Sequence, residues 1–327
     1  MTPEQDTSET AELRNFQQRL LVWFDQHKRD LPWRRDRDPY RVWLSEIMLQ
    51  QTRVAAVTDH YVRFLRRFPS IEKLASAREA TVLAAWSGLG YYRRARMLHA
   101  AAKEIVKEHG GKFPEKAEDL LALPGIGRYT ASAIASIAFA EPVAVVDGNV
   151  ERVLQRVRGK NLAGEDLWRA AGDLLSQRRP GDFNQAMMEL GATVCLPRQP
   201  QCLLCPVCDL CATRGELQRP GKGPRQTKQE IHYAFACRNG SIFMVQRPKT
   251  ATLMPGMWEL PETVSADGST ATWLTLRHSI TVTDYVVRVL RSQASKGLEG
   301  RWVQKSRVAT LPLTGLARKI LRAAKII

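Results

Sequence analysis

Five of the six cysteines of this chain lie between residues 195 and 211, in the stretch CLPRQPQCLLCPVCDLC. A disulfide framework would require an oxidising compartment. The N-terminal residues MTPEQDTSETAELRNF hold no basic segment followed by an apolar one, and no apolar run approaches the roughly 18 residues that a membrane span needs. We therefore expect a cytoplasmic protein whose thiols are reduced.

Clustered reduced thiolates indicate a metal centre. Two sets of four ligands fit the spacing. One set is Cys195, Cys202, Cys205 and Cys211, and the other is Cys202, Cys205, Cys208 and Cys211, with two residues in each gap. The spacing alone leaves both sets open.

Two carboxylates stand in contexts that suit acid–base chemistry. In YRVWLSEIMLQQTRV, residues 40–54, Glu46 lies in a predicted helix beside mainly apolar positions, which should raise its pKa and suit a general acid. The alternative is that Glu46 simply reaches solvent past that face. In VAVVDGNVERVL, residues 143–154, Asp147 stands where an apolar run meets a helix, as an N-cap does. The helix dipole would keep that carboxylate ionised.

A glycine-rich hairpin precedes an alanine-rich helix in ALPGIGRYTASAIASIAF, residues 122–139. Gly125 and Gly127 would let backbone N–H groups at the helix N-terminus meet a phosphate, although a purely structural turn fits equally well. The stretch around Gly88-Leu89-Gly90 and Tyr91 is a weaker signal of the same kind.

The elements that must position these residues fall into two patterns. From about residue 10 to 190 apolar residues recur at helical spacing, with breaks at Pro69, Gly110-Gly111 and Pro124, which predicts a mainly α domain over residues 10–213 after a disordered tail at 1–9. Residues 214–229 are rich in Gly, Pro and basic side chains and indicate a linker.

The remaining residues, 230–327, predict an α+β domain. Strands are expected on both sides of Asn239-Gly240 and in YVVRVLRSQ and RWVQ, before a C-terminal helix around LARKILRAA. The whole chain carries 49 basic and 33 acidic side chains, a net charge of +16, which indicates a polyanionic partner such as nucleic acid.

Taken together, RDLPWRRDRDPYRVWLSEIMLQQTRV, WSGLGYYRRARMLH, LPGIGRYTA, VDGNVERVL and the cysteine spacing resemble, in order, the motifs of MutY-type adenine DNA glycosylases. That family belongs to the helix-hairpin-helix superfamily, which also contains endonuclease III. The resemblance covers nearly the whole chain. It implies a helix-hairpin-helix catalytic domain with an iron–sulfur module, followed by a Nudix-like (MutT-like) domain.

The resemblance also implies roles for individual residues. Glu46 would protonate the leaving adenine at N7, and Asp147 would stabilise the sugar cation, supported by Tyr129 and Asn149. Residues that would enter the duplex or lie near the adenine pocket are Gln51, Tyr91, Leu49, Arg29, Trp33 and Arg34. The family's cysteine spacing implies a [4Fe-4S] cluster on Cys195, Cys202, Cys205 and Cys211 and leaves Cys208 spare, with zinc as the alternative.

Position 129 distinguishes branches of the superfamily. Bifunctional relatives carry a lysine there for Schiff-base chemistry, whereas this chain has Tyr129, so we expect a monofunctional hydrolase. The alternatives are a bifunctional glycosylase/lyase and a non-catalytic lesion-binding protein. The expected partner is double-stranded DNA with adenine opposite 8-oxoguanine or guanine, bound by a monomer, at the nucleoid if the source is bacterial.

The C-terminal domain departs from the family at its lesion-reading hairpin. The family usually has Phe-Ser-His there, and this chain has Ile280-Thr281-Val282. Thr281 would replace the serine hydroxyl, but Val282 supplies no polar group, so we expect altered readout of 8-oxoguanine. The glutamate-rich helix of active Nudix hydrolases is missing from TVSADGSTATWL, which predicts binding without hydrolysis.

Overall fold

The structure is a computed structural model that describes residues 3–217, 227–263, 272–280, 283–291 and 299–327. The chain divides into two compact units. The first comprises Met1–Val62, Ser70–Glu72 and Ala100–Pro220, and the second Arg63–Pro69, Lys73–His99 and Gly221–Ile327. Residues 63–69 and 73–99, expected in the first domain, therefore pack with the C-terminal region.

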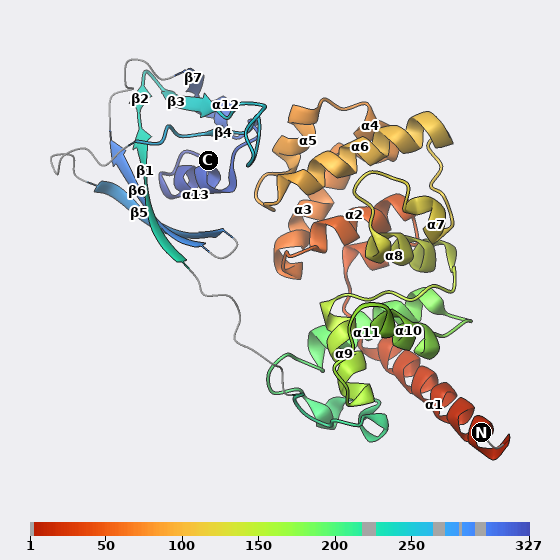
Figure 1. The fold of residues 1–327 in the computed structure, drawn as a ribbon. Coiled ribbons are helices and arrows are strands. Elements are labelled where there is room, and N and C mark those ends of the chain that lie inside the picture. Colours follow the sequence, from red (N-terminus) through yellow and green to blue (C-terminus); the bar gives the residue numbers. More distant parts are fainter. Residues whose placement is uncertain (1–2, 218–226, 264–271, 281–282, 292–298) are drawn as a thin grey trace. The chain divides into compact units, whose positions relative to one another are not determined.

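The first unit is helical, as predicted (Figure 1). Its helices are α1 (Pro3–His27), α2 (Pro39–Leu49), α7 (Ala117–Leu120), α8 (Arg128–Phe139), α9 (Gly148–Arg158), α10 (Gly164–Leu174) and α11 (Pro180–Thr193), with short turns η1 (Pro32–Arg34), η2 (Cys202–Leu204) and η3 (Cys208–Leu210). Helices α3 (Val54–Arg67), α4 (Ile71–Ala75) and α6 (Tyr92–His109) contribute to both units.

Local signals explain where several helices begin and end. Helix α2 has Pro39 in its first turn, and the side chain of Asp38 caps it by accepting from the N–H of Arg41 at 3.0 Å. The predicted breaks are confirmed, because α3 ends before Pro69 and α6 ends before Gly110-Gly111. Helix α1, however, begins at Pro3, inside the tail expected to be disordered. Proline is tolerated in a first helical turn, and the Glu and Ala residues that follow favour a helix.

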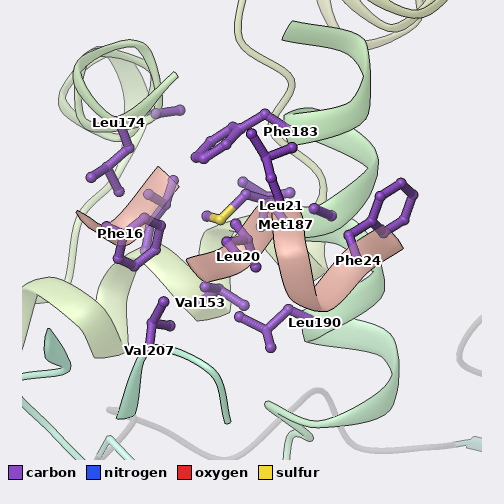
Figure 2. Close-up of a cluster of buried hydrophobic side chains, with 14 of the residues drawn as sticks. Phe16, Leu20, Leu21, Phe24, Val153, Leu174, Phe183, Met187, Leu190 and Val207 are labelled. Atoms are coloured by element: carbon purple, nitrogen blue, oxygen red, sulfur yellow. The ribbon is translucent and has the colours of Figure 1, made fainter. Parts of the chain in front are cut away.

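One hydrophobic core holds much of the first unit together (Figure 2). Helix α1 contributes one side of it, and α9, α10 and α11 contribute the other, with side chains that include Phe16, Leu20, Phe24, Val153, Leu174, Phe183, Met187 and Leu190. Each such side chain stabilises the fold by about 1.5–3 kcal/mol relative to exposure. Val207, from the cysteine-rich stretch, is buried in the same core, so this core also anchors the loop that carries the thiols.

The second unit contains α5 (Glu79–Trp86) and two sheets. The first sheet has the order β1-β6-β5, with β1 (Thr227–Phe235) parallel to β6 (Thr283–Arg291) and β5 (Thr272–Ile280) antiparallel to β6. In the second, β3 (Ser241–Gln246) pairs with β2 (Cys237–Arg238), β4 (Trp258–Glu259) and β7 (Arg301–Gln304). Helices α12 (Lys305–Val308) and α13 (Gly315–Ala323) complete the unit.

Most sequence expectations for this unit are confirmed. Asn239 and Gly240 adopt positive φ angles of 47° and 70° and join β2 to β3, as a tight hairpin requires. The expected later strands correspond to β6 and β7, and the expected C-terminal helix is α13. Thr281, Val282 and most of TVSADGSTATWL lie outside the described residues, so the predictions made for them stay predictions.

Contacts inside the second unit explain why it includes part of the helical region. The hydroxyl of Tyr92 donates to the carbonyl of Leu313 at 2.6 Å, and Arg318 Nε donates to the hydroxyl of Ser87 at 2.7 Å. Arg96 also donates to the carbonyl of Pro255. These hydrogen bonds join α5 and α6 to residues more than 150 positions away, which local sequence patterns do not reveal.

Candidate active site

Glu46 is buried on α2, with only 6% of its surface exposed. The hydroxyl of Tyr129, from α8, donates a hydrogen bond of 2.5 Å to its Oε2. The pKa of Glu46 is raised from 4.5 to about 7. Burial is the main cause and the negative charge of Asp147 adds to it, while the hydrogen bond from Tyr129 and the charge of Arg34 oppose it. Glu46 therefore does not reach solvent past its helix, and the predicted rise of its pKa is confirmed.

Tyr129 shares this buried setting. Its pKa lies well above 10, because burial and the neighbouring Glu46 carboxylate both disfavour a phenolate. The hydroxyl therefore keeps its proton and acts as a donor. The same hydroxyl also lies 3.6 Å from the sulfur of Met188, on α11.

Asp147 is the N-cap of α9, as predicted. Its Oδ1 accepts from the backbone N–H groups of Asn149 at 2.9 Å and Val150 at 2.8 Å, and its Oδ2 accepts from Nδ2 of Asn149 at 2.9 Å. Three N–H groups thus orient the carboxylate at the N-terminus of α9.

A cavity of about 580 Å³ brings these groups together. Its lining includes the residues that the sequence singled out on other grounds: Arg29, Trp33, Arg34, Glu46, Leu49, Gln51, Tyr129, Asp147 and Asn149. These side chains come from the loop after α1, from η1, from α2 and the residues just after it, from α8, and from the start of α9. A volume of this size is typical of small-molecule pockets, so the cavity has room for a nucleobase.

Three predicted residues lie elsewhere. Tyr91 belongs to the second unit, where it has a positive φ of 47°, and it is described only within that unit. Gly125 has a φ of 73° and Gly127 is the N-cap of α8, so both lie in the hairpin before that helix and do not line the cavity. At Gly127 an added Cβ would meet nothing within 4 Å.

One side of the cavity, which α11 supplies, is not predicted from the sequence. Its lining residues are Gln185, Met188, Glu189 and Ala192. Their spacing of three, four and seven residues places them on one helical face, a pattern that could have identified them. A glutamate inside the otherwise apolar run MMELGA was the strongest available signal.

Glu189 organises the arginines of the cavity. Its side chain is 1% exposed and accepts from Arg29 at 2.6 and 2.7 Å and from Arg34 at 2.9 Å. Burial opposes its charge, but the hydrogen bonds from the two arginines outweigh this and lower the pKa of Glu189. Two cations and one buried anion leave this wall of the cavity with a net positive charge.

The five clustered cysteines line a second cavity, at the end of α11. Arg156 Nη1 lies 3.2 Å from Sγ of Cys195, and Sγ of Cys211 lies 3.3 Å from the carbonyl of Arg156. None of the six cysteines takes part in a disulfide in this structure. Burial raises the pKa of Cys205 to about 11, so a bound cation would be needed to make it a thiolate at neutral pH.

This donor set fits the metal centre expected from the sequence. Soft sulfur ligands, an apolar wall and an arginine that donates to sulfur suit an iron–sulfur cluster. Within the described ranges, no group of three or more histidine, cysteine or acidic side chains is arranged to hold a metal ion. All five thiols line the cavity, so the structure does not single out Cys208.

Hydrogen bonds connect the two cavities. Arg152, which is buried, donates from Nη2 to Oδ1 of Asn149 at 2.9 Å and from Nε to the carbonyl of Cys195 at 2.8 Å. Asn149 in turn donates to Asp147. The N-cap carboxylate of α9 and the first cysteine therefore belong to one hydrogen-bonded network.

The chain is similar in sequence to known DNA repair proteins. Residues 44–169 match the family model of the HhH-GPD superfamily base excision DNA repair protein. The chain is 51% identical to the adenine DNA glycosylase of Mus musculus over 227 residues. The aligned region covers 65% of this chain and 44% of the mouse protein. The chain thus spans less than half the length of that relative.

Two further matches cover more of the other protein. The adenine DNA glycosylase of Buchnera aphidicola subsp. Acyrthosiphon pisum (strain APS) is 38% identical over 243 residues, which is 71% of this chain and 69% of that protein. The solved structure of a thermostable thymine-DNA glycosylase matches with a TM-score of 0.59 and 30% identity, over 63% of this chain and 97% of that one.

In the described part of the chain, no helix is both long and apolar enough to cross a membrane.

Proposed function

Because this chain belongs to the family of MutY-type adenine DNA glycosylases, we propose that it hydrolyses the N-glycosidic bond of adenine in double-stranded DNA where the adenine faces 8-oxoguanine or guanine. The observation that carries the proposal is the buried Glu46, hydrogen-bonded to Tyr129 in a cavity that Asp147 also lines. A glycosylase must extrude its target nucleotide, and this cavity would receive the base.

Glu46 is the proposed general acid. Adenine leaves poorly as an anion, so a proton must reach it, at N7, as the bond to the sugar breaks. A pKa of about 7 keeps much of Glu46 protonated near neutral pH, and it still allows the proton to be given up. Burial, the first cause of that raised pKa, is the device by which other glycosidases produce a carboxylic acid at neutral pH.

Asp147 is the proposed stabiliser of the sugar cation. Departure of adenine leaves an oxocarbenium-like sugar, and a nearby carboxylate lowers the energy of that cation. Asp147 suits this role because three N–H groups hold it at the N-terminus of α9. Asn149 and Tyr129 support the two carboxylates, and water then attacks the sugar to leave an abasic site.

We propose that the reaction stops at that stage. Strand cleavage through a Schiff base needs an amine beside the sugar. Tyr129 occupies the position where bifunctional relatives carry lysine, and among the described residues no lysine lines the cavity. The enzyme is therefore assigned as monofunctional.

The DNA is proposed to meet three further parts of the chain. The hairpin with Gly125 and Gly127 would hold a backbone phosphate at the N-terminus of α8. Gln51, Leu49 and Tyr91 would enter or contact the duplex near the extruded nucleotide. Residues 230–327, as a Nudix-like domain, would read the base opposite adenine, with Thr281 at the recognition hairpin of that domain.

The cysteine cavity is proposed to hold a [4Fe-4S] cluster on Cys195, Cys202, Cys205 and Cys211. The cluster would cross-link the segment after α11 and supply positive charge that keeps these thiols ionised. Hydrolytic removal of a base transfers no electron, so the cluster has no part in the chemical step. Cys208 would remain a free thiol, and a colourless protein that binds zinc and lacks iron would contradict this assignment.

Single-turnover adenine release tests the proposed activity. Matched duplexes would carry adenine opposite 8-oxoguanine, guanine, cytosine or thymine, and strand breaks would be measured with and without alkali. We expect alkali-dependent breaks, fastest opposite 8-oxoguanine, and expect Glu46→Gln to bind the duplex but to release no adenine. Alkali-independent breaks that borohydride traps would indicate a lyase, and salt-dependent binding without base release would indicate a binding protein.

A further inference from the structure

The segment at residues 142–146 leads directly into Asp147 and belongs to no helix and to none of the described sheets. Val145 in this segment is 1% exposed. A buried backbone N–H or carbonyl without a hydrogen-bond partner destabilises the fold, so the buried backbone groups of this segment need partners from another part of the protein.

The side chain of Asn184 supplies that replacement. Asn184 lies on α11 and is 3% exposed. Its Oδ1 accepts from the N–H of Val145 at 3.1 Å, and its Nδ2 donates to the carbonyl of Val143 at 2.9 Å. One amide therefore pairs with an N–H and a carbonyl two residues apart, as an adjacent strand would do.

The same amide ties the segment to a second helix. Nδ2 of Asn184 also donates to the hydroxyl of Ser136, on α8, at 2.9 Å. Helix α8 carries Tyr129, which holds Glu46. Asn184 thus lies between the helix that positions the proposed acid and the segment that ends in the proposed cation stabiliser.

Close packing makes this arrangement rigid on both sides of Asn184. A Cβ added to Gly181 would lie 2.4 Å from the carbonyl oxygen of Ser136, and one added to Gly191 would lie 2.6 Å from Cβ of Asn149. Helix α11 therefore touches α8 near one end and the first turn of α9 near the other. Helix α11 thus packs against both the helix that carries Tyr129 and the helix that Asp147 caps.

We propose that Asn184 is a positioning residue for base excision, which fixes the place of Asp147 relative to the Glu46–Tyr129 pair. The proposal rests on the function proposed above. It assigns Asn184 no contact with the substrate, because Asn184 does not line the cavity. Its effect passes through residues 143–146 and through Ser136.

This role has a consequence that simple core packing lacks. The groups that influence Glu46 are Tyr129 from α8, Asp147 before α9 and Arg34 from η1. The charge of Asp147 raises the pKa of Glu46, so release of the segment should let that pKa fall. A displacement of the stabilising carboxylate by about 1 Å would also slow the reaction by roughly 100-fold.

The experiment compares Asn184→Leu and Asn184→Ala with a matched control, Gln17→Leu. Gln17 also uses a side-chain amide to bind backbone, at the carbonyls of Leu174 and Leu175, but it does not line the candidate active site. The pKa of Glu46 would be followed by carboxyl ¹³C resonances of glutamate-labelled protein, with the signal identified by its loss in Glu46→Gln. Single-turnover rates across pH 5 to 9 and duplex affinity complete the set.

We expect both Asn184 variants to lower the pKa of Glu46, to move the alkaline limb of the rate profile to lower pH and to reduce the rate by roughly 100-fold with duplex affinity nearly unchanged. Gln17→Leu should leave the pKa and the profile in place. If Asn184→Leu fails to fold, Asn184→Ala decides, because water can enter the vacated space and satisfy the freed backbone groups.

Two results would overturn the proposal. One is an unchanged Glu46 pKa in the folded Asn184 variant, and the other is a rate profile that matches that of Gln17→Leu. Failure of the proposed function would be distinct, because the wild-type protein would then release no adenine while the carboxyl titration would still report on the position of Asp147.

Discussion

The buried Glu46 should make the protein less stable as the pH rises, and Glu46→Gln should remove that dependence. In the folded protein the pKa of Glu46 is about 7, against an ordinary value of 4.5. The folded state thus holds a proton that the unfolded state loses over this range. Stability falls where the unfolded state binds fewer protons, so it declines between about pH 4.5 and pH 7 and stays reduced above that.

The size of this effect follows from the two pKa values. One pKa unit corresponds to about 1.4 kcal/mol, so the difference between about 7 and 4.5 amounts to about 3 kcal/mol. Glu46 is almost fully buried, so solvent screening reduces this figure little. A neutral glutamine carries no such dependence. The free energy of unfolding of Glu46→Gln, relative to wild type, should therefore improve by about 3 kcal/mol between pH 4 and pH 8.5.

Urea denaturation of both proteins at pH 4 and pH 8.5, followed by circular dichroism, measures this difference. Other titrating groups are common to both proteins and cancel in the comparison. The variant alters the hydrogen bond with Tyr129 at both pH values, so only the change with pH is diagnostic. If the difference in free energy of unfolding between Glu46→Gln and wild type is the same at both pH values, the burial argument for Glu46 is refuted.

Three further outcomes are expected. Tyr129→Phe removes a hydrogen bond that lowers the pKa of Glu46, so the alkaline limb of the adenine-release profile should move to higher pH, and a limb at lower pH would contradict the assigned donor. Gly191→Ala should cost about 1–3 kcal/mol of stability in thermal or urea unfolding, because the added methyl group meets the first turn of α9. Cys208→Ala should keep its iron, whereas Cys205→Ala should lose it. Iron analysis after anaerobic purification measures both, and loss of iron from Cys208→Ala with retention in Cys205→Ala would contradict the proposed ligands.

Local features of this chain were predictable because they depend on neighbouring residues. The N-cap at Asp147, the hairpin at Asn239-Gly240 and the helix end before Pro69 each follow from the conformational preferences of a few consecutive side chains. The apolar neighbours of Glu46 in its helix also made a raised pKa a candidate reading, although the sequence left exposure to solvent as the alternative. Such inferences need no knowledge of which helices meet.

Features that depend on distant partners were not predictable in the same way. The ion pairs of Glu189 with Arg29 and Arg34 span 160 and 155 residues, and the amide of Asn184 reaches back 41 residues to Val143. The packing of residues 73–99 with the C-terminal region has the same origin. No periodicity within a helix encodes these contacts.

The sequence by itself determined the helical character of the first unit and the clustering of the thiols, and it singled out Glu46 and Asp147 as candidates, because side-chain type and short spacing suffice for these. Only the tertiary structure decided that Glu46 is buried against Tyr129, and that one face of α11 closes the cavity. The pKa of a carboxyl depends on everything within a few ångströms of it, whatever its distance along the chain. That environment exists only once α2, α8, α9 and α11 have packed together.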